Sequence, residues 1–233
     1  MSQVKALADA INAFVVGCKD DGIWEPIKAA CILAGWNNLN GILVPLKGPA
    51  PTNFNFVGTD YNRATGLKGD GSTKYLNSNR PNNADPQNSQ HALVFLTQAH
   101  TDGGAGSYID SGLGTGDTLI TKSGISGRMV LRSRHPGGAS LVVDNIGNPV
   151  NVVGVSRSSS TQVTGRVAGQ NFNFTNTSAT SSSNPILVFA RFASPVTEHT
   201  DARIAFCSIG EHLDLAALET RVATLMSDIG AAI

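Results

Sequence analysis

The sequence predicts a mostly β protein, an antiparallel β-sandwich or jelly roll with a short helix near each end. Beyond residue 52, short segments of β-forming residues recur, each bounded by Gly, Asn, Ser or Pro, a pattern typical of all-β folds. Apolar residues at helical spacing lie near the two ends instead. We therefore expect one structural unit, in which a helical and extended segment, residues 1–45, packs on a sandwich domain, residues 46–233.

The first predicted helix runs from about Val4 to Gly17. Its apolar residues are spaced by three and four positions and would form one face: Leu7, Ala10, Ile11, Phe14, Val15 and Cys18. The pattern over residues 27–34 fits a strand or a short helix equally well. Trp24 and Trp36 are expected to pin this segment to the sandwich.

The predicted strands follow one another without intervening helices, as in an antiparallel sandwich. They lie at residues 53–58, 73–78, 91–98, 117–122, 128–133, 140–145, 150–158, 162–169, 171–177, 186–192 and 202–210. Polar linkers at 80–90 and 177–185 read as loops.

The second predicted helix closes the chain. Asp214 stands where an N-cap belongs, and a narrow apolar stripe follows: Leu215, Leu218, Val222, Leu225 and Ile229. The stripe can pack on its own domain or pair with a helix of another chain. Because the chain is also nearly free of net charge, we expect a homo-oligomer, with a trimer favoured and the terminal helices near the contact.

The charge composition of the chain argues against some classes of function. Lysine plus arginine equals aspartate plus glutamate at 17 each, so the chain has no global attraction for nucleic acid or for an anionic membrane. Charged residues make up 15%, below the roughly 25% of ordinary domains, which suits surfaces buried against neighbours. The N-terminus is a poor signal peptide and no run reaches the length of a membrane span. We expect synthesis in a cytoplasm and no membrane insertion.

The three cysteines, Cys18, Cys31 and Cys207, have neither the spacing of a disulfide framework nor that of a metal site. We expect them to be reduced and buried.

The stretch LKGDGSTKYLNSN, residues 67–79, allows three interpretations. A phosphate loop requires a different spacing of Gly and Lys and a following helix. A cation loop would use oxygen atoms of Asp70, Ser72 and Thr73, with Asp60 nearby. Asp-Gly also forms tight turns, and a turn that leads into a strand is the favoured interpretation.

No enzyme motif is apparent. Glycoside hydrolysis needs two carboxylates about 5–10 Å apart, and no predicted strand carries acidic residues at alternate positions. The glutamates are scattered: Glu25, Glu198, Glu211 and Glu219. Nucleophile and zinc-binding motifs are also missing. We expect no catalytic residues, no metal site, no cofactor and no enzymatic activity.

Four segments, taken together and in order, resemble a group of bacteriophage virion and tail proteins. They are residues 11–35, 50–91, 186–191 and 202–226. In addition, GLKGDGSTKYLNSN resembles an entry strand of concanavalin A-like, or laminin-G-like, jelly rolls. The resemblance implies a lectin-like sandwich with a closing helix, located in the virion.

The implied function is that of a phage structural protein in the tail, tail fibre or tail tip, with host-glycan adhesion as a secondary role. A capsid decoration or head-fibre protein is the alternative, and a non-viral carbohydrate-binding protein is the third. The expected partners are further copies of the chain, other virion proteins and a host cell-surface glycan.

A sugar site would use an aromatic platform with amides and hydroxyls at loop tips. The candidates are Tyr61, Tyr108, Asn82, Asn83 and the loop around Ser181. Core packing explains the phenylalanines at 54, 56, 172 and 174 more simply, so the sequence leaves the carbohydrate-binding residues unassigned.

Overall fold

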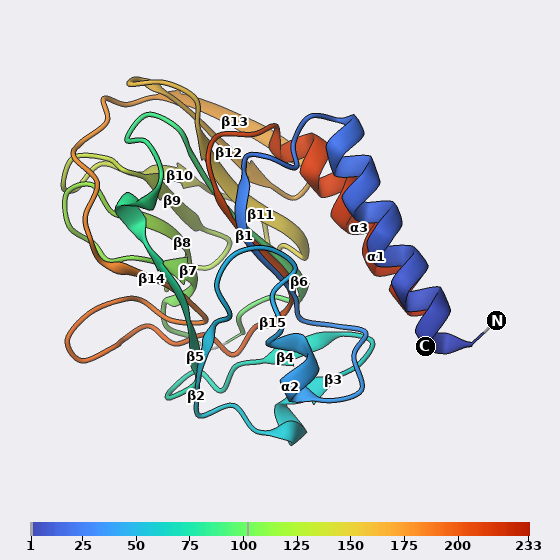
Figure 1. The fold of residues 1–233 in the computed structure, drawn as a ribbon. Coiled ribbons are helices and arrows are strands. Elements are labelled where there is room, and N and C mark those ends of the chain that lie inside the picture. Colours follow the sequence, from blue (N-terminus) through green and yellow to red (C-terminus); the bar gives the residue numbers. More distant parts are fainter. Residues whose placement is uncertain (1, 102) are drawn as a thin grey trace.

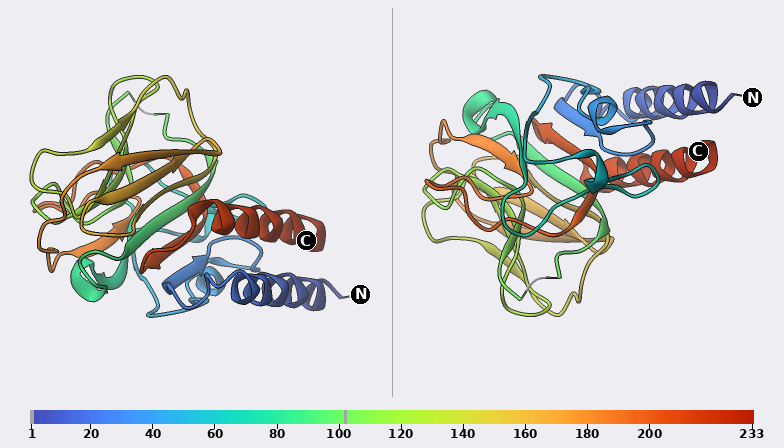
Figure 2. Two further views of the ribbon diagram at one scale, coloured as in Figure 1. Left: turned by 90° about the horizontal axis from the view of Figure 1, so that it is seen from above. Right: turned by 90° about the horizontal axis from the view of Figure 1, so that it is seen from below.

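The computed structural model describes residues 2–101 and 103–233, which fold into three layers (Figure 1). Helices α1 (Gln3–Asp20) and α3 (Leu215–Ala232) lie side by side on the outer face of an eight-stranded sheet. A seven-stranded sheet packs on the other face of that sheet. Figure 2 shows that the helix pair extends past the edge of the sandwich and brings the two termini close together.

The eight-stranded sheet is antiparallel in every pair recorded among the described residues. Its strands, in spatial order, are β13 (Gln170–Thr175), β12 (Gln162–Val167), β11 (Asn151–Arg157), β6 (Gln90–Gln98), β15 (Arg203–Gly210), β4 (Gly66–Lys68) and β3 (Tyr61–Asn62), with β1 (Ile27–Ile32) pairing on β15. Residues 27–32, which the sequence left open, are therefore a strand.

The seven-stranded sheet completes the jelly roll. Its strands, in spatial order, are β10 (Leu141–Val143), β9 (Met129–Ser133), β8 (Thr118–Lys122), β7 (Gly106–Asp110), β14 (Pro185–Val188), β5 (Tyr75–Pro81) and β2 (Thr52–Phe54). Three short helical pieces lie in the connections: α2 (Leu39–Ile42), η1 (Gly58–Asp60) and η2 (Asn82–Ala84).

Alternation along β6 shows how the layers are joined. Val94 and Leu96 point into the core between the sheets, whereas Leu93 and Phe95 point into a second core beneath the helices. Successive side chains on a strand face opposite sides, so a nearly continuous apolar run fills both cores. Phe14 of α1 meets Phe206 of β15 edge to face at 5.6 Å between ring centroids in that second core.

The fold class predicted from the sequence is confirmed, and so are the main strands. Asp214 caps α3 as expected, accepting a hydrogen bond from the amide of Ala216 at 2.8 Å. Strand β7 was missed, because its sequence GSYID carries polar residues that are nevertheless buried. The division into a segment 1–45 and a domain 46–233 stays a prediction.

The apolar stripe of α3 lies within the chain. Each of its five residues is at most 2% exposed and packs in the core shared with α1 and the eight-stranded sheet. Arg221 also ties α3 to Asp21 at the end of α1 through two hydrogen bonds of 2.7 Å. Of the two alternatives for this stripe, the structure shows packing on its own domain. The expected homo-oligomer stays a prediction.

We predict that Leu225→Glu prevents stable folding. The new carboxylate would lie at a site that is 1% exposed, and burying an unpaired charge costs several kcal/mol, roughly. Ala223→Glu on the exposed side of the same helix is the matched control and should melt near the wild type. Circular dichroism melting of both variants checks this, and a Leu225→Glu protein of wild-type melting temperature would contradict the packing described above.

Candidate functional site

The loop at residues 69–74 is a turn held by one carboxylate. Asp70 accepts backbone hydrogen bonds from Ser72, Thr73 and Lys74 at 2.8–3.1 Å, and the Thr73 hydroxyl donates at 2.6 Å. Gly71 adopts a φ of 73°, which glycine tolerates. Burial raises the pKa of Asp70, but the hydrogen bonds from Thr73, Ser72 and Lys74 outweigh it and hold that pKa well below its usual range. The turn interpretation is therefore confirmed.

The carboxylate oxygens that could bind a cation in this loop are already engaged by other groups. The oxygens of Asp70 already accept four donors, and Asp60 forms an ion pair with Lys74 at 2.5 Å. Among the residues that the structure describes, no group of three His, Cys, Asp or Glu side chains could hold a metal ion. In the same part of the chain, no helix is long and apolar enough to span a bilayer.

The sugar-site candidates from the sequence do not form a common platform. Tyr108 is fully buried in the core, and its hydroxyl accepts from the amide of His100 at 3.2 Å. Asn82 is fully buried in a polar network and donates to the carbonyl of Gly116 at 2.6 Å. The hydroxyl of Tyr61 is bound to the carbonyl of Trp36 at 2.6 Å. These side chains hold the fold together.

Asn83 is exposed but follows the buried Asn82 in η2, and the Ser181 hydroxyl is buried. Neither lies beside an aromatic side chain in a recorded ring contact among the described residues. The interpretation of these loop tips as a sugar site is therefore not supported.

An aromatic platform exists elsewhere, on the outer face of the seven-stranded sheet. Phe54 and Tyr75 are cross-strand partners on β2 and β5, with parallel rings whose centroids are 4.4 Å apart. His199 lies 6.0 Å from Tyr75. Leu76 points into the core, and its neighbour Tyr75 is partly buried and packs against the edge of that core. Phe54 is 37% exposed, which corrects its interpretation as a core residue.

Amides and a hydroxyl surround this Phe54–Tyr75 stack. Asn55, the residue after Phe54, donates to the carbonyl of Thr73 at 2.9 Å. Asn79 donates to the carbonyl of Ala50 at 2.8 Å and to the Thr52 hydroxyl at 2.9 Å. These neutral polar side chains lie on β2 and β5 or next to them, in the same part of the sheet as the stack.

A buried charged cluster lies further along the same face. The guanidinium of Arg191 binds Asp110 at 2.8 Å and also binds Glu198. Ser107 donates to Asp110 at 3.1 Å and shares a hydrogen bond of 2.7 Å with Thr121. Sequence reasoning missed this cluster because its two carboxylates come from segments far apart in the chain.

Burial dominates the electrostatics of this Asp110–Arg191–Glu198 cluster. Desolvation raises the pKa of Asp110 to about 7, against the opposing effect of Arg191. The Asp110 side chain is 0% exposed, whereas that of Glu198 is 27% exposed. A general acid must reach its substrate, and Asp110 does not. The cluster instead fastens the segment 191–198 onto β7 and β8.

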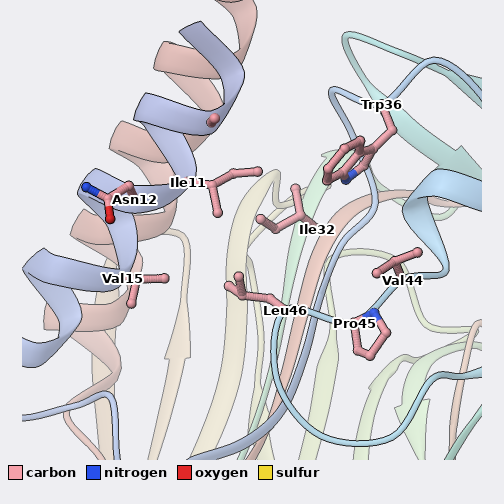
Figure 3. Close-up of a pocket in the computed structure, with 9 residues that line it drawn as sticks. Ile11, Asn12, Val15, Ile32, Trp36, Val44, Pro45 and Leu46 are labelled. Carbon is pink, nitrogen blue, oxygen red and sulfur yellow. The ribbon is translucent and has the colours of Figure 1, made fainter. Parts of the chain in front are cut away.

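A second surface feature is an apolar groove beside α1 (Figure 3). Ile11 and Val15 of α1 face Trp36 and Leu46 across a hollow of about 400 Å³, which adjoins a second one of about 150 Å³. Val44 on the rim is 63% exposed and Val4 at the start of α1 is 75% exposed. Trp36 is thus partly a surface residue, at 36% exposed.

Comparison with known proteins finds similar folds among solved structures, but no match by sequence. No family model and no curated protein sequence matches the chain. The receptor-binding domain of a botulinum neurotoxin C/D mosaic serotype matches with a TM-score of 0.56 and 12% identity, covering 86% of this chain and 51% of that one. The Ruminococcus gnavus sialidase module CBM40, bound to sialyllactose, has a TM-score of 0.43, 13% identity and coverage of 57% and 82%.

Mouse laminin α1 domains LG4-5 match with a TM-score of 0.41 and 12% identity, over 74% of this chain and 47% of that one. The chain thus spans about half the length of the toxin and laminin structures. The toxin match, at 12% identity, supports the β-sandwich fold of this chain.

We predict that Asp110→Asn makes the protein more stable at high pH. The folded pKa of about 7 exceeds the ordinary 3.8, so the folded state holds this proton more tightly. The stability that this group contributes is therefore present below about pH 4 and lost as the pH rises to 7. The free energy of unfolding of Asp110→Asn, relative to the wild type, should increase by a few kcal/mol, roughly, between pH 4 and 8.

Urea unfolding at several pH values measures this difference. Asp144→Asn is the control, because Arg128 lowers the pKa of that exposed carboxyl and its effect should not change over this range. A pH-independent difference for Asp110→Asn would contradict the raised pKa.

Proposed function

We propose that the chain is a bacteriophage virion protein whose lectin-like sandwich binds a host-surface glycan at the Phe54–Tyr75 stack. The observation that carries the binding proposal is the pair of parallel rings, 4.4 Å apart, of which Phe54 is 37% exposed and Tyr75 is partly buried. An aromatic face stacks on the C–H side of a sugar ring, while amides and hydroxyls bind its hydroxyl groups.

The virion assignment rests on the resemblance of residues 11–35, 50–91, 186–191 and 202–226 to phage tail proteins. A place in the tail, tail fibre or tail tip accords with an adhesive role, whereas a head decoration or head-fibre protein would need no glycan site. Antibody labelling of purified particles distinguishes these positions. A chain encoded outside a phage gene cluster would favour the non-viral carbohydrate-binding protein.

The proposal is one of binding without hydrolysis. The two carboxylates brought together on the outer face, Asp110 and Glu198, are both engaged by Arg191. A glycosidase instead needs one carboxyl as acid and the other as nucleophile or base, with both open to the sugar.

A second candidate function is self-association of the chain into an oligomer. The apolar groove beside α1 is the observation that supports it. Three large apolar side chains that line this groove are exposed: Val4, Trp36 and Val44. Such a cluster of exposed apolar side chains marks an interaction site more often than chance. We propose that a second copy of the chain covers this groove in a homo-oligomer.

We predict that Phe54→Ala and Tyr75→Ala each weaken glycan binding about tenfold, since each removes one ring of the stack. Binding to an array of bacterial surface oligosaccharides measures the effect. Trp36→Ala, which alters an exposed aromatic side chain in the groove, should bind as the wild type does. Unchanged array signals for both stack variants would refute this site, and so would a wild-type protein that binds no glycan.

We predict that Val44→Glu dissociates the oligomer while leaving the fold intact, because the side chain is exposed in the single chain and would be buried between copies. Light scattering gives the mass and circular dichroism the fold. Val142→Glu, on an exposed valine of β10, is the control and should keep the wild-type mass. A wild-type protein that stays monomeric at high concentration would contradict self-association through the groove.

A further inference from the structure

Two of the three cysteines lie directly opposite each other on neighbouring strands. Cys31 of β1 and Cys207 of β15 are register partners in the eight-stranded sheet (Figure 1), and both side chains point into the core between the two sheets. Cys18 lies in the other core, beneath the helices. All three cysteines are buried and have free thiols. The fold therefore brings two of the three thiols together and keeps the third apart from them.

The backbone spacing at this Cys31–Cys207 pair suits a disulfide. The amide of Leu33 donates to the carbonyl of Ala205 at 2.8 Å, so these two residues form a hydrogen-bonded pair of the antiparallel ladder. Cys31 and Cys207, two positions along, form the next such pair. The Cα atoms of a hydrogen-bonded pair are about 5.5 Å apart, within the range of roughly 4.4–6.8 Å that disulfides span. A bond between the two sulfur atoms is therefore compatible with the strand pairing.

The two thiols already contact each other. A hydrogen bond to Cys207, together with burial, raises the pKa of the Cys31 thiol well above its usual range. The same hydrogen bond lowers the pKa of Cys207, against the effect of burial. Cys31 is thus the donor and Cys207 the acceptor, so Cys207 loses its proton first. Because the thiolate is the reactive form of cysteine, Cys207 is the nucleophile of the pair. By contrast, burial raises the pKa of Cys18 to about 12.

A small hollow adjoins the pair. It has a volume of about 20 Å³ and is lined by both cysteines and by Pro49 and Pro51 of the connection between α2 and β2. Cys31 is 6% exposed and Cys207 is 7% exposed, whereas Cys18 is 0% exposed. A hollow of this volume admits a molecule about as large as water and excludes a bulky oxidant such as a disulfide of glutathione. The oxidant that fits is the smallest peroxide.

We propose that hydrogen peroxide converts Cys31 and Cys207 into a disulfide. The Cys207 thiolate attacks the peroxide, takes one oxygen atom as a sulfenic acid and releases hydroxide, which combines with the proton that the thiol had lost to form water. The Cys31 thiol then attacks the Cys207 sulfur and displaces its hydroxyl group as a second water molecule. Two thiols and one hydrogen peroxide thus give one disulfide and two water molecules. The thiols lose two electrons, which reduce the peroxide.

The disulfide would fasten the layer of helices to the sandwich. β1 follows α1 in the chain and pairs with β15, so the new bond would join the two strands covalently. It would close residues 31–207, which are most of the chain, into one loop. A disulfide that closes a long loop strongly restricts the unfolded chain, so the oxidised protein should resist unfolding better than the reduced protein. This chemistry depends neither on glycan binding nor on the groove beside α1.

The test treats the full chain, purified under reducing conditions, with hydrogen peroxide and counts the free thiols of the unfolded protein by alkylation and mass spectrometry. The count should fall from three to one, and reductant added to the unfolded protein should restore it. A digest made without reductant should contain the peptides of Cys31 and Cys207 joined to each other. The treated protein should melt about 5–10 °C higher than the untreated protein.

Serine variants identify the reacting thiols, and the wild-type measurement stands without them. Cys18→Ser is the matched control and should lose both of its thiols on treatment. Cys31→Ser should form no disulfide and should instead accumulate a sulfenic acid at Cys207, which dimedone traps. Three thiols that survive treatment of the wild type would overturn the proposal, as would a disulfide to Cys18 or a bond between two chains. A treated protein that melts no higher than the untreated one would overturn the stabilising effect of the bond.

Discussion

Burial of both faces of the eight-stranded sheet is the constraint on which the rest of the structure depends. Leu93 and Phe95 of β6 fill the core under the helices, while Val94 and Leu96 fill the core between the sheets. Each such side chain contributes about 1.5–3 kcal/mol when it leaves water. The sheet therefore requires a cover on each side, and α1 with α3 provides one as the seven-stranded sheet provides the other. The two helices are therefore an integral part of the fold, because their apolar faces complete the second core.

The seven-stranded sheet, by contrast, packs on another layer with its inner face only. Its outer face can therefore carry side chains that do not belong to an apolar core. Strands whose outer side chains meet no further layer can carry polar, aromatic or charged groups, and β5 and β7 do so. At the centre of that face Arg191 binds Asp110 and Glu198, and both Arg191 and Asp110 are buried. At its edge, Phe54 is exposed and stacks on the partly buried Tyr75. The Asp110–Arg191–Glu198 cluster holds the segment 191–198 in place. His199, which lies beside Tyr75, is the next residue in the chain after this segment.

Much of this architecture could be predicted from the sequence because apolar periodicity reports burial directly. The strands β6 and β15 and the capped helix α3 follow from such patterns. Strand β7 could not be predicted this way, since Ser107 and Asp110 are buried through hydrogen bonds that long-range partners supply. The stack was missed for a related reason: in NFNF, Phe54 and Phe56 share one alternation pattern, yet Phe56 is 4% exposed and Phe54 is 37% exposed. The chain departs from strict alternation at Asn55, whose φ is 67°.

The antiparallel pairing of α1 and α3 places the beginning and the end of the chain side by side at the far tip of the helix pair (Figures 1 and 2). The pair therefore acts as a handle with both attachment points at one end, behind the eight-stranded sheet. A fluorescent protein or a surface linker joined to either end would hold the sandwich from the back. Immobilisation at either terminus would then present the same side of the protein to the solution.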